Sequence, residues 1–310
     1  MTEIAGHSTA ETKCGFVALI GVPNSGKSTL INQLVGAKVS IVTHKVQTTR
    51  ARVRGIVMQG PVQLVMVDTP GIFKPRRMLD RAMVSTAWGE AGEADVIVLM
   101  IDAARGLEEG SLKIIEGLAK SKANAKKPIA IALNKVDTVK RDELLALAHA
   151  CDETGIADDI FMISALNGDG VSDLLEWCGE HMPLSPWHFD PDTLSDMPQR
   201  LLAAEITREK LYLRLHKELP YASTVETEQW ESRDDGSVRI DQTIFVDRES
   251  QKPIIVGKGG QTLKSIGAES RKELESLLGH RVHLFIHVKV REKWAEEQAR
   301  LREIGLDILG

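Results

Sequence analysis

The sequence predicts an α/β fold with a mostly parallel sheet, followed by a smaller α+β region. Between residues 15 and 178, short apolar runs alternate with helical stretches, and each run ends in turn residues. Runs that are apolar on both faces suit parallel strands covered by helices. The expected strands are 16–21, 64–68, 96–102, 129–134 and 160–164, and the alternating stretch 52–58 is expected to pair at the sheet edge.

A proline-rich stretch marks a boundary between two domains. Residues 181–198, HMPLSPWHFDPDTLSDMP, contain four prolines among acidic and small residues, which disfavour both helix and sheet. With 310 residues the chain is long enough for two domains that each bury a core. We expect a flexible N-terminal arm at 1–14, a first domain at 15–180, a linker at 181–198 and a second domain at 199–310.

The bulk composition favours a soluble cytoplasmic protein, with 43% hydrophobic and 27% charged residues. No apolar run approaches the roughly 18 residues of a membrane span, and the first residues lack a secretory pattern. Cys14, Cys151 and Cys178 lack the spacing of a disulfide framework or a zinc site. The net charge of −5 argues against nucleic-acid binding over the whole protein surface. A local basic patch is still compatible with this average.

The second half of the chain has a different pattern from the first. Helical spacing over 199–218 is followed by two strand-like runs, 222–230 and 237–246, with a turn between them. A short apolar segment then leads into GKGG, and we expect a helix over 261–278, a strand over 281–290 and a charged final helix. No repeat or low-complexity tract interrupts this order.

The octapeptide GVPNSGKS at 21–28 predicts a phosphate-binding loop. It follows an apolar strand and opens a helix, which is the context in which this pattern binds phosphates. Glycines let backbone N–H groups turn toward phosphate oxygens. Lys27 is expected to reach the β- and γ-phosphates, and the Ser28 hydroxyl to ligate Mg²⁺. The alternative is a glycine turn before an ordinary helix. The expected nucleotide contacts in this motif are Gly21, Val22, Pro23, Asn24, Ser25, Gly26, Lys27, Ser28 and Thr29.

A second motif, DTPG, occupies 68–71 after another apolar run. The Asp68 carboxylate is expected to hold the metal, through water. Gly71 is expected to supply an N–H to the γ-phosphate and to move when that phosphate leaves. Thr69 and Pro70, between these two residues, complete the predicted nucleotide contacts of the motif.

The polar stretch 42–52, between the two motifs, predicts a mobile loop. Thr49, or its neighbour Thr48, is expected to add a hydroxyl to Mg²⁺ only when the γ-phosphate is present, and we favour Thr49. A solvated loop without a ligand is the alternative. The predicted metal ligands are therefore Ser28, Thr49 and Asp68, and the predicted catalytic residues are Lys27, Thr49 and Gly71.

The motif NKVD at 134–137 predicts a site that selects guanine over adenine. Asp137 can accept from both the N1–H and the exocyclic amine of guanine, whereas adenine offers no such donor pair and would leave a buried charge unmet. Asn134 can support the base and the phosphate loop, and Lys135 can lie along the sugar and base. Ser164, Ala165 and Leu166 are expected to close the base pocket, with backbone N–H groups of Ser164 and Ala165 directed to guanine O6. A helix-capping aspartate is the rival interpretation of NKVD alone.

The residue after Gly71 raises a difficulty for hydrolysis. Many guanine-nucleotide switches place a glutamine there to orient the attacking water, but this chain has Ile72. We expect slow intrinsic turnover, with another group, a cation or a partner completing the site. Asn24 is a candidate ligand for K⁺, which would add positive charge beside the phosphates, and a plain turn-forming role for Asn24 is equally open.

GKGG at 257–260 predicts an RNA-binding loop. A tight glycine turn lets a sugar-phosphate backbone come close, although a GxxG pattern alone is more often a simple turn. From Lys252 to Arg302 the sequence has eleven Lys or Arg residues and six Asp or Glu residues, so this segment is locally basic. The predicted RNA-binding residues are Gly257, Lys258, Gly259, Gly260, Lys264 and Arg271.

Together these residues resemble the Era family of bacterial GTPases over nearly the whole chain from about Gly15. The resemblance is carried by PNSGKSTLIN at 23–32, QTTR at 47–50, DTPGI at 68–72, NKVD at 134–137, REKL at 208–211, ELPY at 218–221 and IVGKGG at 255–260. Val22 and Ser25 stand where Arg and Val are frequent in that family, and neither position supplies an essential side chain.

This resemblance implies a Ras-like P-loop GTPase domain joined to a type II KH domain. It also implies binding of GTP, GDP and Mg²⁺, binding of the 3′ end of 16S rRNA, and a role in 30S subunit maturation. The family is further described as loosely associated with the inner membrane and tied to cell-cycle control. We expect a monomer that binds no DNA. The alternatives are a non-hydrolytic RNA-binding module, another translation-related GTPase such as a tRNA-modifying relative, and an ATP kinase, which NKVD opposes.

Overall fold

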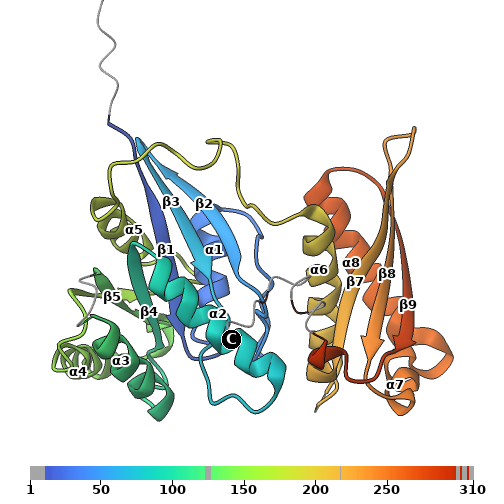
Figure 1. Ribbon diagram of the computed structural model, residues 1–310, viewed down its shortest axis with the longest axis horizontal. Helices are drawn as coiled ribbons and strands as arrows, with labels where there is room; N and C mark the ends of the chain where they lie inside the picture. The colour runs from blue at the N-terminus through green and yellow to red at the C-terminus, as the bar shows by residue number, and fades with distance from the viewer. Residues whose placement is uncertain (1–10, 123–126, 217, 298–300, 302–305, 307–310) are drawn as a thin grey trace, which may run out of the picture. The chain divides into compact units, whose positions relative to one another are not determined.

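The computed structural model describes residues 11–122, 127–216, 218–297, 301 and 306 (Figure 1). These residues group into two compact units. The first contains residues up to 37 together with 54–68 and 89–196, and the second contains 38–53, 69–88 and the residues from 197 onward. Two segments that precede residue 180 in the sequence therefore fold with the C-terminal half of the chain.

The first unit is built around a six-stranded sheet with the order β2-β3-β1-β4-β5-β6. The pairs β1–β3, β1–β4, β4–β5 and β5–β6 are parallel, as the sequence predicts. Only two residues separate β2 from β3, so these two strands form an antiparallel hairpin at the predicted edge. The strands are β1 (Lys13–Gly21), β2 (Val53–Gln59), β3 (Val62–Asp68), β4 (Val96–Asp102), β5 (Ile129–Asn134) and β6 (Asp159–Ile163).

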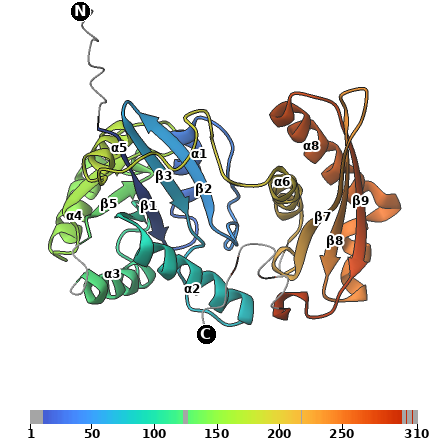
Figure 2. The ribbon, with the colours of Figure 1, turned by 45° about the horizontal axis from the view of Figure 1, so that its top comes forward.

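Helices cover both faces of this sheet (Figures 1 and 2). Because β4 and β5 are buried along their whole length, their sequences are continuously apolar rather than alternating. Parallel strands end at one edge of a sheet, and the loops after β1, β3, β4 and β5 therefore gather there. The helices are α1 (Lys27–Val35), α2 (Met78–Glu93), α3 (Glu109–Lys122), α4 (Arg141–Asp152) and α5 (Val171–Glu180), and α2 runs from the second unit into the first.

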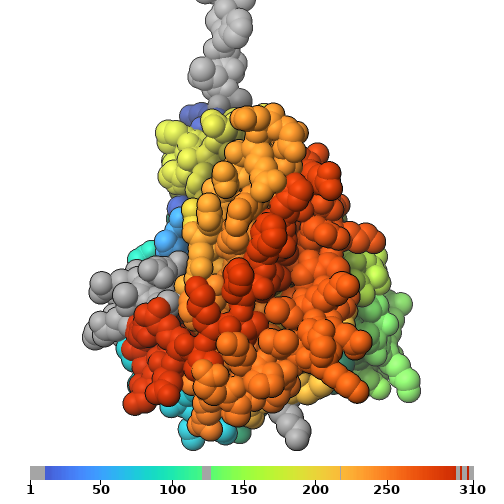
Figure 3. All heavy atoms as spheres, turned by 90° about the vertical axis from the view of Figure 1, so that its right-hand side faces the viewer, coloured from blue at the N-terminus to red at the C-terminus, as the bar shows by residue number. Residues whose placement is uncertain are grey.

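The C-terminal residues form a three-stranded sheet of order β7-β8-β9 (Figure 1), and they face the viewer in Figure 3. Strands β7 and β8 are antiparallel, whereas β8 and β9 are parallel. Helices α6 and α8 share a core with the sheet, in which Leu211, Ile244 and Ile266 are fully buried. The element order, α-β-β-α-α-β, is that of a type II KH domain: α6 (Gln199–Arg214), β7 (Ser223–Ser232), β8 (Val238–Val246), α7 (Lys252–Val256), α8 (Gln261–Leu278) and β9 (Val282–Val290).

Two sequence expectations differ from the structure, and a third lies mostly outside the described residues. The predicted arm at 1–14 includes Lys13 and Cys14, which begin β1 because Lys13 pairs with Val62; residues 1–10 lie outside the described part. The helix predicted over 199–218 ends at Arg214, because Leu215 turns to an extended conformation and packs into the core. Most of the predicted final helix lies outside the described residues. None of the described helices is long and apolar enough to cross a membrane.

The stretch 181–198 follows the sheet of the first unit. The Leu194 carbonyl accepts from the Ile56 N–H, and the Ser195 hydroxyl donates to the Arg54 carbonyl. The buried side chain of Gln63 accepts from the backbone N–H groups of His188 and Phe189 and donates to the Phe189 carbonyl. Residues between 188 and 195 are therefore fixed to β2 and β3 through hydrogen bonds.

Candidate functional site

The phosphate loop lies between β1 and α1 and depends on two glycines. Gly21 ends β1 with φ 152°, and Gly26 caps α1 with φ 102°. A Cβ atom on Gly26 would lie 2.0 Å from Asn134 Nδ2, so no other residue fits there without displacing that side chain. Asn24, with φ 66°, also has the left-handed conformation that places successive N–H groups on one side of a loop. Lys27, Ser28 and Thr29 form the first turn of α1.

Lys27 lies inside this loop and is only 5% exposed. Its ammonium donates to the carbonyls of Gly21 and Val22, at 3.1 and 3.0 Å, and to Ser25 Oγ. Burial lowers the pKa of Lys27 to about 8, and the charge of Asp68 opposes this shift only in part. The ammonium is therefore held over the loop by neutral carbonyls, where an anionic phosphate would be a much stronger partner.

This low pKa predicts that nucleotide affinity depends on pH. GDP phosphates favour the charged lysine, so affinity should fall as pH rises through about 8, and binding there should take up a proton. The opposite sign holds for folding, since a lysine whose folded pKa lies below 10.5 binds fewer protons when folded, and this group favours folding more as pH rises from about 8 to 10.5.

Calorimetric titration with GDP between about pH 7 and 8.5, in buffers of different ionisation enthalpy, measures affinity and proton uptake together. The upper limit stays below the range in which guanine loses its own N1 proton. Equal affinity at both ends of the range, without proton uptake, would contradict the assignment of Lys27 to the phosphates.

Ser28 and Asp68 lie together although forty residues separate them. The Ser28 hydroxyl donates to Asp68 Oδ2 at 2.6 Å, and Asp68, at the end of β3, is fully buried. A hydroxyl and a carboxylate are hard oxygen ligands, which suit Mg²⁺ when phosphates and water complete its octahedron. Within the described residues no group of three or more His, Cys, Asp or Glu side chains could hold a metal alone.

Asn134 ties three predicted motifs together. Its Nδ2 donates to the Ser25 carbonyl of the phosphate loop at 2.8 Å, and its Oδ1 accepts from the Ala165 N–H at 2.9 Å. The side chain is buried at the end of β5. The phosphate loop, NKVD and the segment 164–166 therefore form one hydrogen-bonded group.

Asp137 and Ser164 form the side of the predicted base pocket. Asp137 is exposed, and its Oδ1 accepts from Ser164 Oγ at 2.6 Å, so one carboxylate oxygen is already oriented by the protein. The backbone N–H groups of Ser164 and Ala165 donate to Asp169 O and to Asn134 Oδ1. Both amides predicted to bind guanine O6 are thus engaged within the protein. The side chain of Leu166, the next residue, is 74% exposed.

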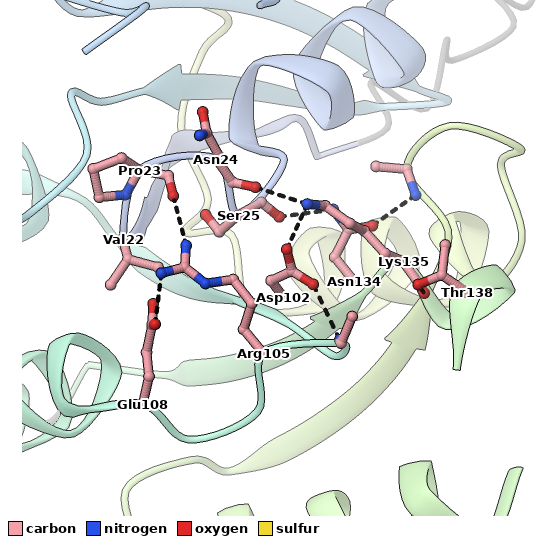
Figure 4. A network of polar contacts seen from close by, with 12 residues as sticks. Val22, Pro23, Asn24, Ser25, Asp102, Arg105, Glu108, Asn134, Lys135 and Thr138 are labelled. Carbon is pink, nitrogen blue, oxygen red and sulfur yellow. Dashed lines mark hydrogen bonds and ion pairs between the residues drawn. The ribbon is translucent and has the colours of Figure 1, made fainter. Parts of the chain in front are cut away.

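Two further residues of this region, Asp102 and Arg105, lie outside the predicted motifs (Figure 4). Lys135 Nζ contacts Asp102 Oδ2 at 2.5 Å and the Asn24 carbonyl at 3.0 Å. Arg105 donates to the Pro23 carbonyl at 3.5 Å and pairs with Glu108 at 2.6 Å. Asp102 and Arg105 follow from the topology, since β4 lies beside β5 and their loops leave from the same edge. No local sequence pattern marks them.

The predicted loop 42–52 and the residues Thr69, Pro70 and Gly71 belong to the second unit, whereas Ser28 and Asp68 belong to the first. Within the second unit the loop is anchored to α6. Arg208 donates to the Thr48 carbonyl at 2.5 Å. Val42 N–H donates to Glu209 Oε1 at 2.9 Å. These contacts hold the residue next to Thr49 on the KH part of the chain.

Arg50 provides the deepest anchor of this loop. Its buried guanidinium donates to the Ser223 carbonyl at 2.9 Å and to the Tyr212 hydroxyl at 2.8 Å, and it lies 5.2 Å from the centre of the Trp294 ring. Ile72, which follows Gly71, is buried as well. An apolar side chain of this kind cannot orient a water for attack.

The GKGG loop opens α8 with three residues of positive φ. Gly257, Gly259 and Gly260 have φ of 75°, 59° and 77°. Gly260 is the N-cap of α8 and supplies no side-chain cap, and backbone N–H groups at a helix N-terminus can bind an anion. Lys258 in the loop and Lys264 and Arg271 on α8 are all exposed. The predicted RNA-binding residues therefore lie along one loop and one helix.

The comparisons with known proteins agree with both halves of this description. Residues 16–135 match the family described as 50S ribosome-binding GTPase, and residues 218–295 match the KH domain family. The GTPase Era of Brucella suis is 58% identical over 99% of this chain and 98% of its own length, and that of Rhizobium meliloti is 57% identical over 96% and 93%.

Two solved Era structures have the same architecture. A single-residue variant of Aquifex aeolicus Era bound to GDP·AlF₄⁻ gives a TM-score of 0.90 at 38% identity and covers 96% of this chain and 100% of its own. An Era structure in complex with MgGDPNP and nucleotides 1506–1542 of 16S ribosomal RNA gives the same values.

A phosphate loop, a guanine-selective NKVD and a type II KH domain in one chain define a P-loop GTPase with a second, RNA-binding domain. Its sequence identity to curated relatives extends over almost the full length of both domains. The chain belongs to the Era family of GTPases, and it is an enzyme that converts GTP and water to GDP and phosphate.

Proposed function

We propose that this chain assists maturation of the small (30S) ribosomal subunit by binding the 3′ end of 16S rRNA through its KH domain under the control of GTP. The observation that carries this proposal is the GKGG loop in its KH context, joined to a nucleotide site whose three motifs are hydrogen-bonded to one another. A relative with the same architecture binds nucleotides 1506–1542 of that RNA. Cytoplasmic location, monomeric state and weak peripheral attachment to the inner membrane remain predictions.

The phosphate side of the proposed site acts through charge and position. Lys27 would exchange its carbonyl partners for the β- and γ-phosphates, and this exchange replaces weak acceptors with charged ones. Ser28 and Asp68 would hold Mg²⁺, which neutralises charge that develops on the phosphates. Thr49 and Gly71 would join the γ-phosphate side only in the GTP state. Such contacts exist in one nucleotide state only, so they can shift the population of conformations.

The base side of the proposed site separates guanine from adenine through Asp137. Ser164 already satisfies one carboxylate oxygen, which orients the side chain for the N1–H and exocyclic amine of guanine. Since the amides of Ser164 and Ala165 are engaged, we assign the donor to guanine O6 to the next backbone N–H, that of Leu166. An Ala substitution at Leu166 would keep that N–H and therefore keep guanine selectivity.

We also propose that K⁺ assists hydrolysis beside Asn24, whose side chain is exposed on the phosphate loop. A cation there would partly replace the missing glutamine after Gly71. GTP turnover should be about tenfold faster in KCl than in NaCl of equal ionic strength. Asn24→Ala should reduce that difference without abolishing GDP binding. Phosphate release measured in the two salts decides the point, and equal rates for the unaltered protein would remove K⁺ from the proposal.

The RNA-binding role can be tested with a matched pair of glycine substitutions on α8. Gly259→Asp places a negative charge in the GKGG loop, and Gly279→Asp places the same charge at the other end of the helix. Both positions have positive φ, 59° and 70°, and open space around the missing Cβ, and aspartate is among the side chains that best tolerate this conformation. Affinity for an RNA carrying 16S nucleotides 1506–1542 should fall about tenfold or more in Gly259→Asp only, because the charge repels the phosphate backbone.

Equal RNA affinity of the two aspartate variants would exclude the GKGG loop as the RNA clamp. A lack of RNA binding by the unaltered protein, with GTP hydrolysis intact, would exclude the ribosomal role and keep the enzyme. Phosphate release with Lys27→Ala as the inactive control establishes the hydrolysis in the same preparation.

A further inference from the structure

Asp102 is a buried carboxylate that none of the nucleotide roles described above uses. It is the last residue of β4, where the parallel pairing with β5 places it beside Asn134. The residue is 5% exposed. A buried carboxylate is unfavourable unless a cation and hydrogen-bond donors meet it. The partners of Asp102 therefore indicate why the chain places a charge at this point.

Both oxygens of Asp102 are engaged. Oδ2 contacts Lys135 Nζ at 2.5 Å, and Oδ1 accepts from the Ala104 N–H at 3.1 Å. The second bond fixes the plane of the carboxylate relative to the turn after β4. Oδ2 is therefore presented to the lysine in one orientation only.

Lys135 in turn joins two loops of the nucleotide site (Figure 4). Its ammonium donates to the Asn24 carbonyl in the phosphate loop at 3.0 Å, while its backbone belongs to the base loop NKVD. That backbone has φ 68° and ψ 36°, a left-handed conformation that residues with a side chain rarely adopt. A strained residue keeps such a conformation when its surroundings over-determine it, and the ion pair of Lys135 with the buried Asp102 is one of these restraints.

We propose that Asp102 is a positioning residue for guanine-nucleotide binding, acting through Lys135 on the base loop and the phosphate loop together. The inference depends on the proposed nucleotide site, because Lys135 is assigned to the sugar and base there. With the ammonium fixed by Asp102, the aliphatic stem of Lys135 is aligned where the base and ribose would lie. The same contact holds the Asn24 carbonyl away from the phosphates. Neither effect involves a γ-phosphate, so Asp102 serves GDP and GTP alike.

Asp102→Asn separates this role from a purely structural one. The asparagine keeps an Oδ1 acceptor for the Ala104 N–H and removes only the charge that holds Lys135. Its affinity for GDP and for GTP should each fall about tenfold or more, mainly through faster dissociation, while the ratio of the two affinities stays unchanged. GTP turnover at saturating GTP and the preference for guanine over xanthine should also stay unchanged, because Asp137 is untouched.

Asp95→Asn is the matched control. Asp95 precedes β4 at its opposite end, and its Oδ2 accepts from the Phe16 N–H at 2.8 Å, so it too is an aspartate bonded to a backbone amide beside the same strand. Asp95→Asn should affect the thermal midpoint of unfolding and leave both nucleotide affinities as they are. Loss of affinity in both variants to the same degree would show a general effect of strand stability and overturn the proposal.

A double-mutant cycle with Lys135→Met gives the decisive readout. The double variant lacks both charges, so it leaves no unpaired ammonium even where Asp102→Asn alone folds poorly. If Asp102 acts through Lys135, the double variant should bind GDP within about twofold of Lys135→Met. A further tenfold loss in the double variant would overturn the proposal. Failure of the unaltered protein to bind guanine nucleotides would instead refute the nucleotide site on which the inference depends.

Discussion

Asp137→Asn should weaken GTP binding by about 100-fold or more, or roughly 3 kcal/mol, and should create binding of xanthosine triphosphate. The Ser164 hydroxyl donates to Oδ1, so an asparagine would keep its oxygen toward Ser164 and present its NH₂ group to the base. Guanine offers donors at that edge and would meet another donor, whereas xanthine has a carbonyl at C2 that accepts. Competition of a fluorescent GDP analogue by GTP, XTP and ATP measures the exchange of preference.

Asp142→Asn is the control for this substitution. Asp142 is an exposed residue in the first turn of α4, five positions beyond Asp137. Asp142→Asn therefore removes one negative charge, as Asp137→Asn does, but outside the base pocket. It should leave all three affinities unchanged. An Asp137→Asn variant that loses GTP binding without gaining XTP would indicate a damaged pocket rather than base recognition by this carboxylate.

Gly26→Ala should reduce guanine-nucleotide affinity at least 100-fold. The added Cβ would lie 2.0 Å from Asn134 Nδ2, so the bond from Asn134 to the Ser25 carbonyl cannot survive. With φ at 102°, alanine also strains the backbone of the phosphate loop. The loop and the base pocket should then lose their common hydrogen-bonded geometry together. Titration with GDP and a thermal melt of the same sample separate this effect from unfolding.

Gly36→Ala provides the comparison on the other end of α1. Gly36 has φ 70° and no heavy atom within 4 Å of the missing Cβ, so alanine there meets backbone strain but no collision. Its cost should be about 1–2 kcal/mol of folding stability with unchanged GDP affinity. Equal nucleotide affinity in the two variants would contradict the tight contact between the phosphate loop and Asn134.

The sequence predicts those elements and contacts whose signal lies within one short segment of the chain. Parallel strands such as β4 and β5 could be predicted because burial on both faces leaves continuous apolar runs. The contact between Ser28 and Asp68 could also be predicted, because both motifs end adjacent parallel strands or begin the helix that follows. In each case a local pattern and a simple rule of sheet geometry sufficed.

Contacts between side chains that are distant in the sequence have no local pattern that predicts them. Arg50 and Arg208 resemble ordinary charged residues in the sequence, yet both are buried in the second unit beside Tyr212. Asp102 lies within a predicted strand, but nothing local distinguishes it from an aspartate that simply ends a strand. The amides of Ser164 and Ala165 were assigned to the base, and only the folded turn shows that they already have acceptors.

The hydrogen bonds that fix residues 188–195 to β2 and β3 shorten the free connection between the six-stranded sheet and α6. A flexible linker of eighteen residues would let each domain sample a wide volume around the other, at a low effective concentration. Anchoring through Ser195 leaves only Asp196, Met197 and Pro198 before α6 begins. Three extended residues span at most about 11 Å, so this connection works as a short pivot. Loss of the bonds at Leu194 and Ser195 would lengthen that pivot without altering a single residue of either domain's binding surface.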